Sequence, residues 1–321
     1  MTPDSDGTAV DGLRLNGLVL RAHGGIYEVE TVDGVIEAVL RGRVKREERV
    51  GDKVVVGDRV VVLRSEVSGL DAWTIEQVEE RQSELVRKAP GKAPRAKVIV
   101  ANLDQVLIVF SVTRPDPHLR MLDRFLVLCE SSQLDPVIVA NKVDLLAPEQ
   151  AREVFGVYEK IGYPVIYTST KLDSSVAELK AVLRDRISAL TGPSGVGKSS
   201  LLNGVQPGLA LRVASVSDAV QKGRHTTVTA QLIPLEEGGY VADTPGLREL
   251  GLWGLDREDL HFYFREFEPF LGSCRYGGSC THTHEPGCAV QDAVEAGHIS
   301  RGRYDSYRRI LAGDEEDLDS W

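Results

Sequence analysis

The chain of 321 residues is 42% apolar and 27% charged, with a net charge of −10 at pH 7. It can form two or three domains, since a domain takes roughly 150 residues. The negative charge argues against a protein that coats nucleic acid along its whole surface. Residues 1–11 lack the basic and apolar regions of a signal peptide. No run of about 18 apolar residues occurs either, so we expect a cytoplasmic protein that does not associate with membranes.

Residues 13–80 predict a small β-barrel of short strands separated by turn signals such as Asp33-Gly34. Two locally basic stretches lie in or beside it, Arg41–Arg49 with net charge +3 and Arg81–Lys97 with net charge +5. Within the second stretch, the Pro and Gly residues of Ala89–Ala96 predict a linker. Each stretch fits either a solvated surface or a contact for nucleic acid.

From residue 106 onward, strand-like and helix-like segments alternate, which predicts an α/β domain with a mostly parallel sheet. The segments are strand Val106–Val112, a helix with apolar residues from Leu119 to Cys129, strand Pro136–Ala140, helix Pro148–Ile161 and strand Pro164–Tyr167. Cys129 is then a core residue without a function. Asn141, Ser169, Gly192 and Asp243 each follow a strand-like run. We therefore expect all four at one edge of the sheet, where such sheets bind ligands.

Residues 192–199 match G-x-x-x-x-G-K-[ST], a loop whose backbone N–H groups surround phosphates at the start of a helix. Lys198 reaches the outer phosphates and is a candidate catalytic residue, while the Ser199 hydroxyl binds Mg²⁺. This loop alone does not separate ATP from GTP. Its candidate nucleotide contacts are Gly192, Pro193, Ser194, Gly195, Val196, Gly197, Lys198, Ser199 and Ser200.

Guanine is the base predicted by a four-residue motif, Asn141, Lys142, Val143 and Asp144. The Asp144 carboxylate can accept hydrogen bonds from N1–H and from the exocyclic amine of guanine, whereas adenine offers no such donor pair. An ATP-dependent kinase is therefore disfavoured. Ser169, Thr170 and Lys171 stand in the place of the Ser-Ala-Lys element of GTPases, whose backbone N–H contacts guanine O6.

The segment Asp243-Thr244-Pro245-Gly246 resembles the one whose Asp reaches Mg²⁺ through water and whose Gly senses the γ-phosphate. The next residue is Leu247, where Ras-like enzymes carry a Gln that orients the attacking water. An apolar side chain cannot align water. We therefore expect intrinsic hydrolysis to be slow or to depend on another group.

The segment Lys222–Thr227 has the glycine and polar residues expected of a mobile first switch. Thr227 is the candidate of this segment for binding Mg²⁺. His225 is the candidate for positioning or polarising the attacking water, because imidazole exchanges protons near neutral pH. The alternative is that His225 is an exposed loop histidine with no role.

Four soft or borderline ligands lie within fifteen residues and suit tetrahedral zinc: Cys274, Cys280, His282 and Cys288. Four protein ligands leave no coordination position for water, which predicts a structural site. Such a site would stabilise a C-terminal module that is too small to build its own hydrophobic core. His284 is a competing donor.

A helix-like segment after the cysteines combines basic and aromatic residues. It carries Arg301, Arg303, Tyr304, Tyr307, Arg308 and Arg309. This pattern fits either a surface that faces nucleic acid or a simple solvated helix.

Together these motifs resemble the ribosome small subunit-dependent GTPase A family, which are circularly permuted GTPases of bacterial ribosome assembly. The motifs stand in the order 141–144, 192–199 and 243–246, whereas the phosphate loop comes first in an ordinary small GTPase. The Arg-His-Thr-Thr switch, the Asp-Thr-Pro-Gly-Leu-Arg segment and the Cys…Cys-x-His…Glu-Pro-x-Cys cluster also match. The last match implies that His282, and not His284, is the fourth zinc ligand.

Two departures from the family pattern are visible. Thr170 replaces the expected Ala, and the interval between Cys274 and Cys280 is one residue longer than usual, which Gly277-Gly278 can absorb.

The order of the motifs attaches the switch half of the site, residues 222–246, directly to the zinc module. We expect this connection to pass the hydrolysis state to the module.

The resemblance implies an OB-fold RNA-binding domain at residues 1–90, a permuted P-loop GTPase domain at 91–263 and a zinc-binding domain at 264–321. It further implies GTP or GDP, Mg²⁺ and one structural Zn²⁺ as ligands, and the small ribosomal subunit with its rRNA as partner. We expect a monomer. The implied function is GTP hydrolysis in late maturation of that subunit, stimulated by the subunit. The alternatives are a GTP-gated RNA-binding module with negligible turnover and a GTPase that serves another ribonucleoprotein.

Overall fold

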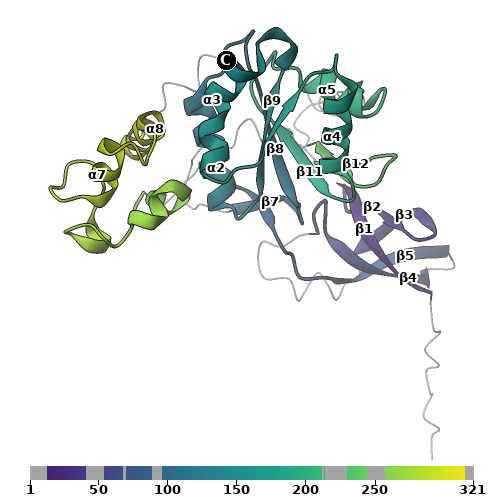
Figure 1. The fold of residues 1–321 in the computed structure, drawn as a ribbon. Coiled ribbons are helices and arrows are strands. Elements are labelled where there is room, and N and C mark those ends of the chain that lie inside the picture. The colour runs from purple at the N-terminus through teal and green to yellow at the C-terminus, as the bar shows by residue number, and fades with distance from the viewer. Residues whose placement is uncertain are drawn as a thin grey trace, which may run out of the picture.

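The computed structural model describes residues 13–40, 54–67, 70–88, 96–211, 213, 230–243 and 257–314. Three parts follow one another along the chain: a β-barrel, a sheet with helices on both faces, and a small helical module (Figure 1). In this part of the chain, no helix is long and apolar enough to cross a lipid bilayer. The basic stretch Arg41–Arg49 lies outside the described residues.

The barrel has five strands, β1 (Arg14–His23), β2 (Ile26–Thr31), β3 (Gly34–Leu40), β4 (Arg59–Val67) and β5 (Leu70–Val78). Strands β1, β2 and β3 form an antiparallel meander, β3 pairs in parallel with β5, and β4 joins β5 to β1 and closes the barrel. This is the small Greek-key barrel of OB type that the sequence predicts. Its interior is filled by apolar side chains, including Val19, Tyr27, Val29, Val60, Val62 and Ile75.

A hairpin of β6 (Glu84–Lys88) and β7 (Ala96–Ala101) joins the barrel to the central sheet. Lys88 is the register partner of Ala96, so the segment between them connects two paired strands. The predicted linker at Ala89–Ala96 lies, except for Ala96, outside the described residues.

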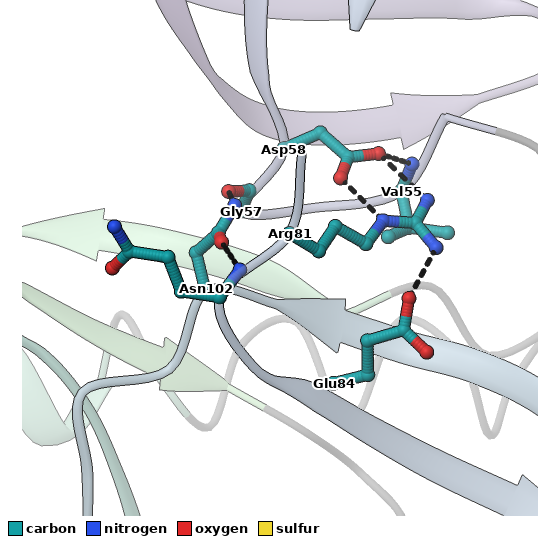
Figure 2. Close-up of polar contacts among 7 residues, drawn as sticks. Val55, Gly57, Asp58, Arg81, Glu84 and Asn102 are labelled. Atoms are coloured by element: carbon teal, nitrogen blue, oxygen red, sulfur yellow. Dashed lines mark hydrogen bonds and ion pairs between the residues drawn. The ribbon is translucent and has the colours of Figure 1, made fainter. Parts of the chain in front are cut away.

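Buried polar contacts lock the barrel onto this hairpin (Figure 2). The Arg81 guanidinium donates from Nε to Asp58 Oδ1 at 2.7 Å and from Nη2 to Asp58 Oδ2 at 3.0 Å. Asn102 Nδ2 donates to the Gly57 carbonyl at 2.9 Å. A Cβ on Gly57 would lie 2.0 Å from the Ala101 carbonyl oxygen, so only glycine allows this approach. Arg81, which contributes to the basic stretch of the sequence, is thus committed to an internal ion pair.

The central sheet contains β8 (Gln105–Ser111), β9 (Pro136–Asn141), β10 (Val165–Thr168), β11 (Ile187–Thr191), β12 (Gln231–Pro234) and β13 (Tyr240–Asp243). Its order is β10-β9-β8-β11-β13-β12, and every pair is parallel except β12 with β13. All seven residues of β8 are buried, as expected for a strand covered on both faces. The mostly parallel sheet predicted from the alternation of segments is confirmed.

Helices cover both faces of this sheet (Figure 1). They are α2 (Leu119–Ser131), α3 (Pro148–Lys160), α4 (Asp173–Leu183) and α5 (Lys198–Val205), with a short 3₁₀ turn η1 (Val143–Leu145). One core contains Leu122 and Leu126 of α2 and Phe155 of α3, and the other contains Leu179 of α4 and Leu201 of α5. Cys129 lies in the first core, as the helical spacing predicts, and its burial raises the pKa of its thiol.

The C-terminal module consists of η3 (Leu260–Tyr263), η4 (Arg265–Phe270), η5 (Gly277–Ser279), α7 (Ala289–Glu295) and α8 (Arg301–Ala312). Its aromatic core includes Phe264, Phe267 and Tyr307, and Val127 of α2 belongs to the same cluster. The module therefore packs on α2 of the central domain.

Helix α8 departs from both interpretations of its basic and aromatic residues. Arg303, Tyr304 and Tyr307 are buried, and only Arg301, Arg308 and Arg309 are exposed. The Tyr304 hydroxyl donates to the carbonyl of His282 at 2.7 Å and the Tyr307 hydroxyl to that of Thr281 at 2.8 Å. The tyrosines thus support the cysteine-rich segment and do not present a stacking surface.

Candidate guanine-nucleotide site and zinc centre

The phosphate loop runs from the end of β11 to the start of α5 and depends on glycine. Gly192, Gly195 and Gly197 have φ angles of 134°, 75° and 100°, a region that other residues rarely adopt. A Cβ on Gly192 would lie 2.1 Å from the Val109 carbonyl oxygen. Ser194, Ser199 and Ser200 are exposed where α5 begins. The helix dipole and free N–H groups at this end favour an anion.

Lys198 is the first residue of α5 and stays close to the loop. Its Nζ donates to the Gly192 carbonyl at 2.7 Å and also to the Pro193 carbonyl. The ammonium is therefore held at the loop by the backbone itself, where it can meet the outer phosphates.

Asn141, the last residue of β9, and Lys142, which follows it, brace the phosphate loop across the intervening strand β8. Asn141 Nδ2 donates to the Val196 carbonyl at 2.8 Å and its Oδ1 accepts from the Thr168 hydroxyl at 3.1 Å. Lys142 Nζ donates to the Gly195 carbonyl at 2.6 Å. These bonds join the base-recognition motif to the phosphate loop although 55 residues separate Asn141 from Val196.

The carboxylate of Asp144 is oriented by two donors. Ser169 Oγ donates to Asp144 Oδ1 at 2.6 Å and Lys171 Nζ to Asp144 Oδ2 at 2.6 Å. The hydrogen bond from Lys171, followed by the one from Ser169, lowers the pKa of the Asp144 carboxyl below its usual value. The group is therefore an ionised acceptor at neutral pH. Lys171 matches the Lys of the Ser-Ala-Lys element but is not among the predicted site residues, and its contact with Asp144 adds it to them.

The backbone N–H groups of the three residues after β10 differ in whether they are hydrogen-bonded. Ser169 N donates to Ser175 Oγ at 3.0 Å and Lys171 N donates to Ser169 Oγ at 3.1 Å. Of these three consecutive amides in the described structure, only that of Thr170 has no hydrogen bond. Thr170 N–H is thus the donor available to a base in this loop, and the backbone role is compatible with Thr in place of Ala.

Four strand ends meet at one edge of the sheet. Asn141 ends β9, Ser169 follows β10, Gly192 follows β11 and Asp243 ends β13. Because β9, β10, β11 and β13 are parallel, these residues share the carboxyl edge, as the sequence predicts. Three further candidates, His225, Thr227 and Gly246, lie outside the described residues, as does Leu247.

The predicted metal ligands Cys274, Cys280, His282 and Cys288 converge in the C-terminal module, where all four are buried. The Cys274 and Cys288 sulfurs are 3.8 Å apart, and His282 Nδ1 lies 3.5 Å and 3.4 Å from them. Zinc–sulfur bonds of about 2.3 Å in a tetrahedron require edges of about 3.8 Å, so the donors fit zinc. His284 is exposed and its Nδ1 contacts Thr283 Oγ1, so it is not part of the set.

Comparison with known proteins identifies the family to which this chain belongs. A family model described as RsgA GTPase matches residues 78–253, more than half of the chain. The chain belongs to the RsgA GTPase family. It is 50% identical to the small ribosomal subunit biogenesis GTPase RsgA of Gemmatimonas aurantiaca over 92% of this chain and 95% of that protein. The RsgA of Moorella thermoacetica is 45% identical over 93% of this chain and 97% of that one.

Solved structures agree with this assignment to the RsgA family. YjeQ from Thermotoga maritima matches with a TM-score of 0.74 and 36% identity, over 94% of this chain and 98% of that one. YloQ, a circularly permuted GTPase, matches with a TM-score of 0.72 and 29% identity, over 97% of both chains. The chain is therefore a GTPase with the permuted fold that the order of its motifs predicts. An ATP-dependent kinase is excluded.

Proposed function

We propose that this chain hydrolyses GTP as a biogenesis factor of the small ribosomal subunit and that binding of the subunit stimulates the reaction. The proposal rests on one observation above all: relatives named small ribosomal subunit biogenesis GTPase RsgA align over more than nine-tenths of the chain. The alignment thus extends beyond the nucleotide site to the barrel and the C-terminal module. Acting on a ribosomal subunit would place the protein in the cytoplasm, and we expect it to act as a monomer.

The chain's own residues assign roles along a bound GTP molecule. Asp144, held by Ser169 and Lys171, would accept from the guanine N1–H and amine, while Thr170 N–H would donate to guanine O6. The loop amides of residues 192–199 and the Lys198 ammonium would surround the phosphates. The contacts of Asn141 and Lys142 with the loop would keep the base and phosphate subsites at a set spacing.

Ser199, Thr227 and, through water, Asp243 would hold Mg²⁺, which neutralises charge on the β- and γ-phosphates when bound. We propose that His225 positions the attacking water, since the side chain of Leu247 has no polar atom for that task. Gly246 would sense the γ-phosphate. A site that lacks the usual Gln invites completion by a partner, which is the physical basis for stimulation by a ribosomal subunit.

We propose that the barrel binds RNA, but that not every face of the barrel takes part. Glu28 of β2 and Glu37 of β3 are register partners and face outward. A polyanion is repelled from such a face, because RNA affinity depends on cations that replace its counterions. The basic stretch Arg41–Arg49 is therefore the better candidate for the rRNA contact.

The zinc module is proposed to be a structural support. Zinc on Cys274, Cys280, His282 and Cys288 would join loop segments that have few helical hydrogen bonds of their own.

GTP turnover measured alone, with purified small subunits and with large subunits tests the proposal. We expect a rise in kcat with small subunits only. Stimulation by another RNA particle instead would favour a GTPase of another ribonucleoprotein, and negligible turnover under all conditions would favour a GTP-gated RNA-binding module.

A further inference from the structure

Strand β1 belongs to the barrel, but its end also pairs with the edge strand β12 of the GTPase sheet (Figure 1). Arg21 and Gln231 are register partners, and Arg21 Nε donates to Gln231 Oε1 at 2.7 Å. Gln231 is only 3% exposed and is itself the register partner of Asp243 on β13. A single row across three strands, Arg21 to Gln231 to Asp243, thus leads from the barrel to the edge of the nucleotide site.

A second polar contact joins the barrel to the other strand of the β12–β13 hairpin. The Tyr240 hydroxyl on β13 donates to Glu30 Oε2 on β2. Burial, together with the neighbouring Glu30, raises the pKa of Tyr240 to about 12, so the hydroxyl keeps its proton at physiological pH. Each strand of the β12–β13 hairpin therefore makes one side-chain hydrogen bond with the barrel, Gln231 with Arg21 and Tyr240 with Glu30.

Apolar packing makes this junction continuous. Val19 lies in the barrel core, whereas Leu20, at a shift in the β1–β2 register, lies in the same core cluster as Ala230 and Leu232 around β12. The Asp58–Arg81 ion pair fixes the barrel a second time, on the segment that leads into β6, where Arg81 also contacts Glu84 (Figure 2). Because the barrel is attached at two separate places, it is not free to rotate against the GTPase sheet. A displacement of β1 should therefore also displace β12.

We propose that Arg21 and Gln231 are positioning residues that couple occupancy of the barrel to the placement of Asp243. This rests on the proposed function for the role of Asp243 at Mg²⁺ and the γ-phosphate. A ligand on the barrel shifts β1, the Arg21–Gln231 bond transmits the shift to β12, and the β12–β13 ladder transmits it to Asp243. Coupling between two binding sites is reciprocal, so the nucleotide must also alter β1.

Reciprocity allows a test without any ribosomal particle. Amide hydrogen exchange in residues 14–23 is compared between the GDP complex and the complex with a non-hydrolysable GTP analogue. We expect a nucleotide-dependent difference in the wild type and its loss in Arg21→Ala. Arg14→Ala is the matched control, since Arg14 is an exposed arginine of β1 distant from β12, and it should keep the difference. Arg21→Lys, which retains a donor, should restore part of it.

The second arm measures stimulation of kcat by small subunits in Arg21→Ala, Gln231→Ala and the double variant. Each single change should reduce stimulation by about tenfold, within the range of allosteric couplings, and the double variant should be no worse than either. Buried Gln231 cannot touch a particle, so its variant separates coupling from a lost RNA contact at Arg21.

Identical exchange of β1 in both nucleotide states of the wild type would overturn the inference. So would additive losses in the double variant, or unchanged stimulation in Arg21→Ala. If small subunits do not stimulate the wild type, the proposed function fails, and the exchange experiment alone decides whether barrel and site are coupled.

Discussion

The guanidinium of Arg303 on α8 lies 2.7 Å from the Asp123 carboxylate on α2, and both side chains are at most 3% exposed. Arg303 also pairs with Glu266 of its own module at 2.7 Å and lies over the Phe264 ring at 4.6 Å. The zinc module is therefore fastened to the helix that precedes β9 and Asn141, in the base-recognition half of the site. The order of the motifs predicts a direct chain connection to the switch half, and this contact adds a second attachment, to the base-recognition half.

Replacing Arg303 by Met should strongly destabilise the protein. The change leaves Asp123 and Glu266 buried without their cation, and breaking a buried pair in this way costs about 3–5 kcal/mol. Chemical denaturation followed by circular dichroism measures the loss. Arg308→Met at an exposed position of the same helix is the control and should stay within about 0.5 kcal/mol of the wild type. A loss below about 1 kcal/mol in the Arg303 variant would contradict the role of the buried pair.

Replacing Cys280 by Ser should abolish tight zinc binding, because one of four soft ligands is lost. Metal analysis after gel filtration measures the zinc content, and limited proteolysis reports the folding of residues 257–314. His284→Ala removes a nearby histidine outside the cluster and should keep both zinc and protease resistance. Zinc retained in the Cys280 variant but lost in the His284 variant would reverse the ligand assignment.

Replacing Asp144 by Asn should move the nucleotide preference from GTP toward xanthosine triphosphate. The amide cannot accept from both guanine donors, and each charge-assisted bond is worth about 1.5–3 kcal/mol, so affinity for GTP should fall by at least about a hundredfold. Equilibrium binding of both nucleotides measures the exchange of preference. Asp173→Asn, at an exposed position of α4, should change neither affinity. Retained guanine preference would refute the assignment of Asp144.

Replacing Lys171 by Met should raise the pKa of the Asp144 carboxyl, since the Lys171 hydrogen bond is the largest cause of its lowering. A carboxyl with a lowered pKa stays ionised until the pH falls through that value. Loss of GTP binding on acidification should therefore begin at a higher pH in the variant. Lys171 is 71% exposed, so the effect at neutral pH should be less than about 1 kcal/mol.

Nucleotide affinity measured as a function of pH tests this shift. Lys180→Met is the matched control. Lys180 forms an ion pair of 2.7 Å with Glu237 and makes no such pair with Asp144. An unchanged acid limit in the Lys171 variant would show that Lys171 does not govern the ionisation of Asp144.

Replacing His225 by Ala should lower kcat by about 10²–10⁴-fold, the range for loss of a general acid or base, while GTP affinity stays close to that of the wild type. Single-turnover hydrolysis and equilibrium binding separate the two effects. His23→Ala, an exposed barrel histidine, controls for the substitution itself. Unchanged turnover in the His225 variant would mean that this residue is a loop histidine without a catalytic role.

Local patterns predicted the elements well where one face or both faces of a segment are apolar. Strand β8 and helices α2 and α3 lie within a few residues of their predicted bounds, because the period of apolar residues reflects burial directly. The failures share a cause. Arg81 and Arg303 look like surface residues by type, but they are held inside by carboxylates that are distant in the sequence, Asp58 for Arg81, and Asp123 and Glu266 for Arg303.

The sequence by itself determined the candidate groups and their order: the glycine loop proposed for phosphates, the Asp144 carboxylate proposed for guanine, the four candidate zinc ligands and the permuted order of the motifs. Each of these depends on residue type and short spacing, which are written in the chain. The tertiary structure alone decided that α2 carries the zinc module and that Arg21 reaches Gln231, 210 positions away. Such contacts depend on how whole elements pack, and no local pattern encodes which distant residue will lie opposite another.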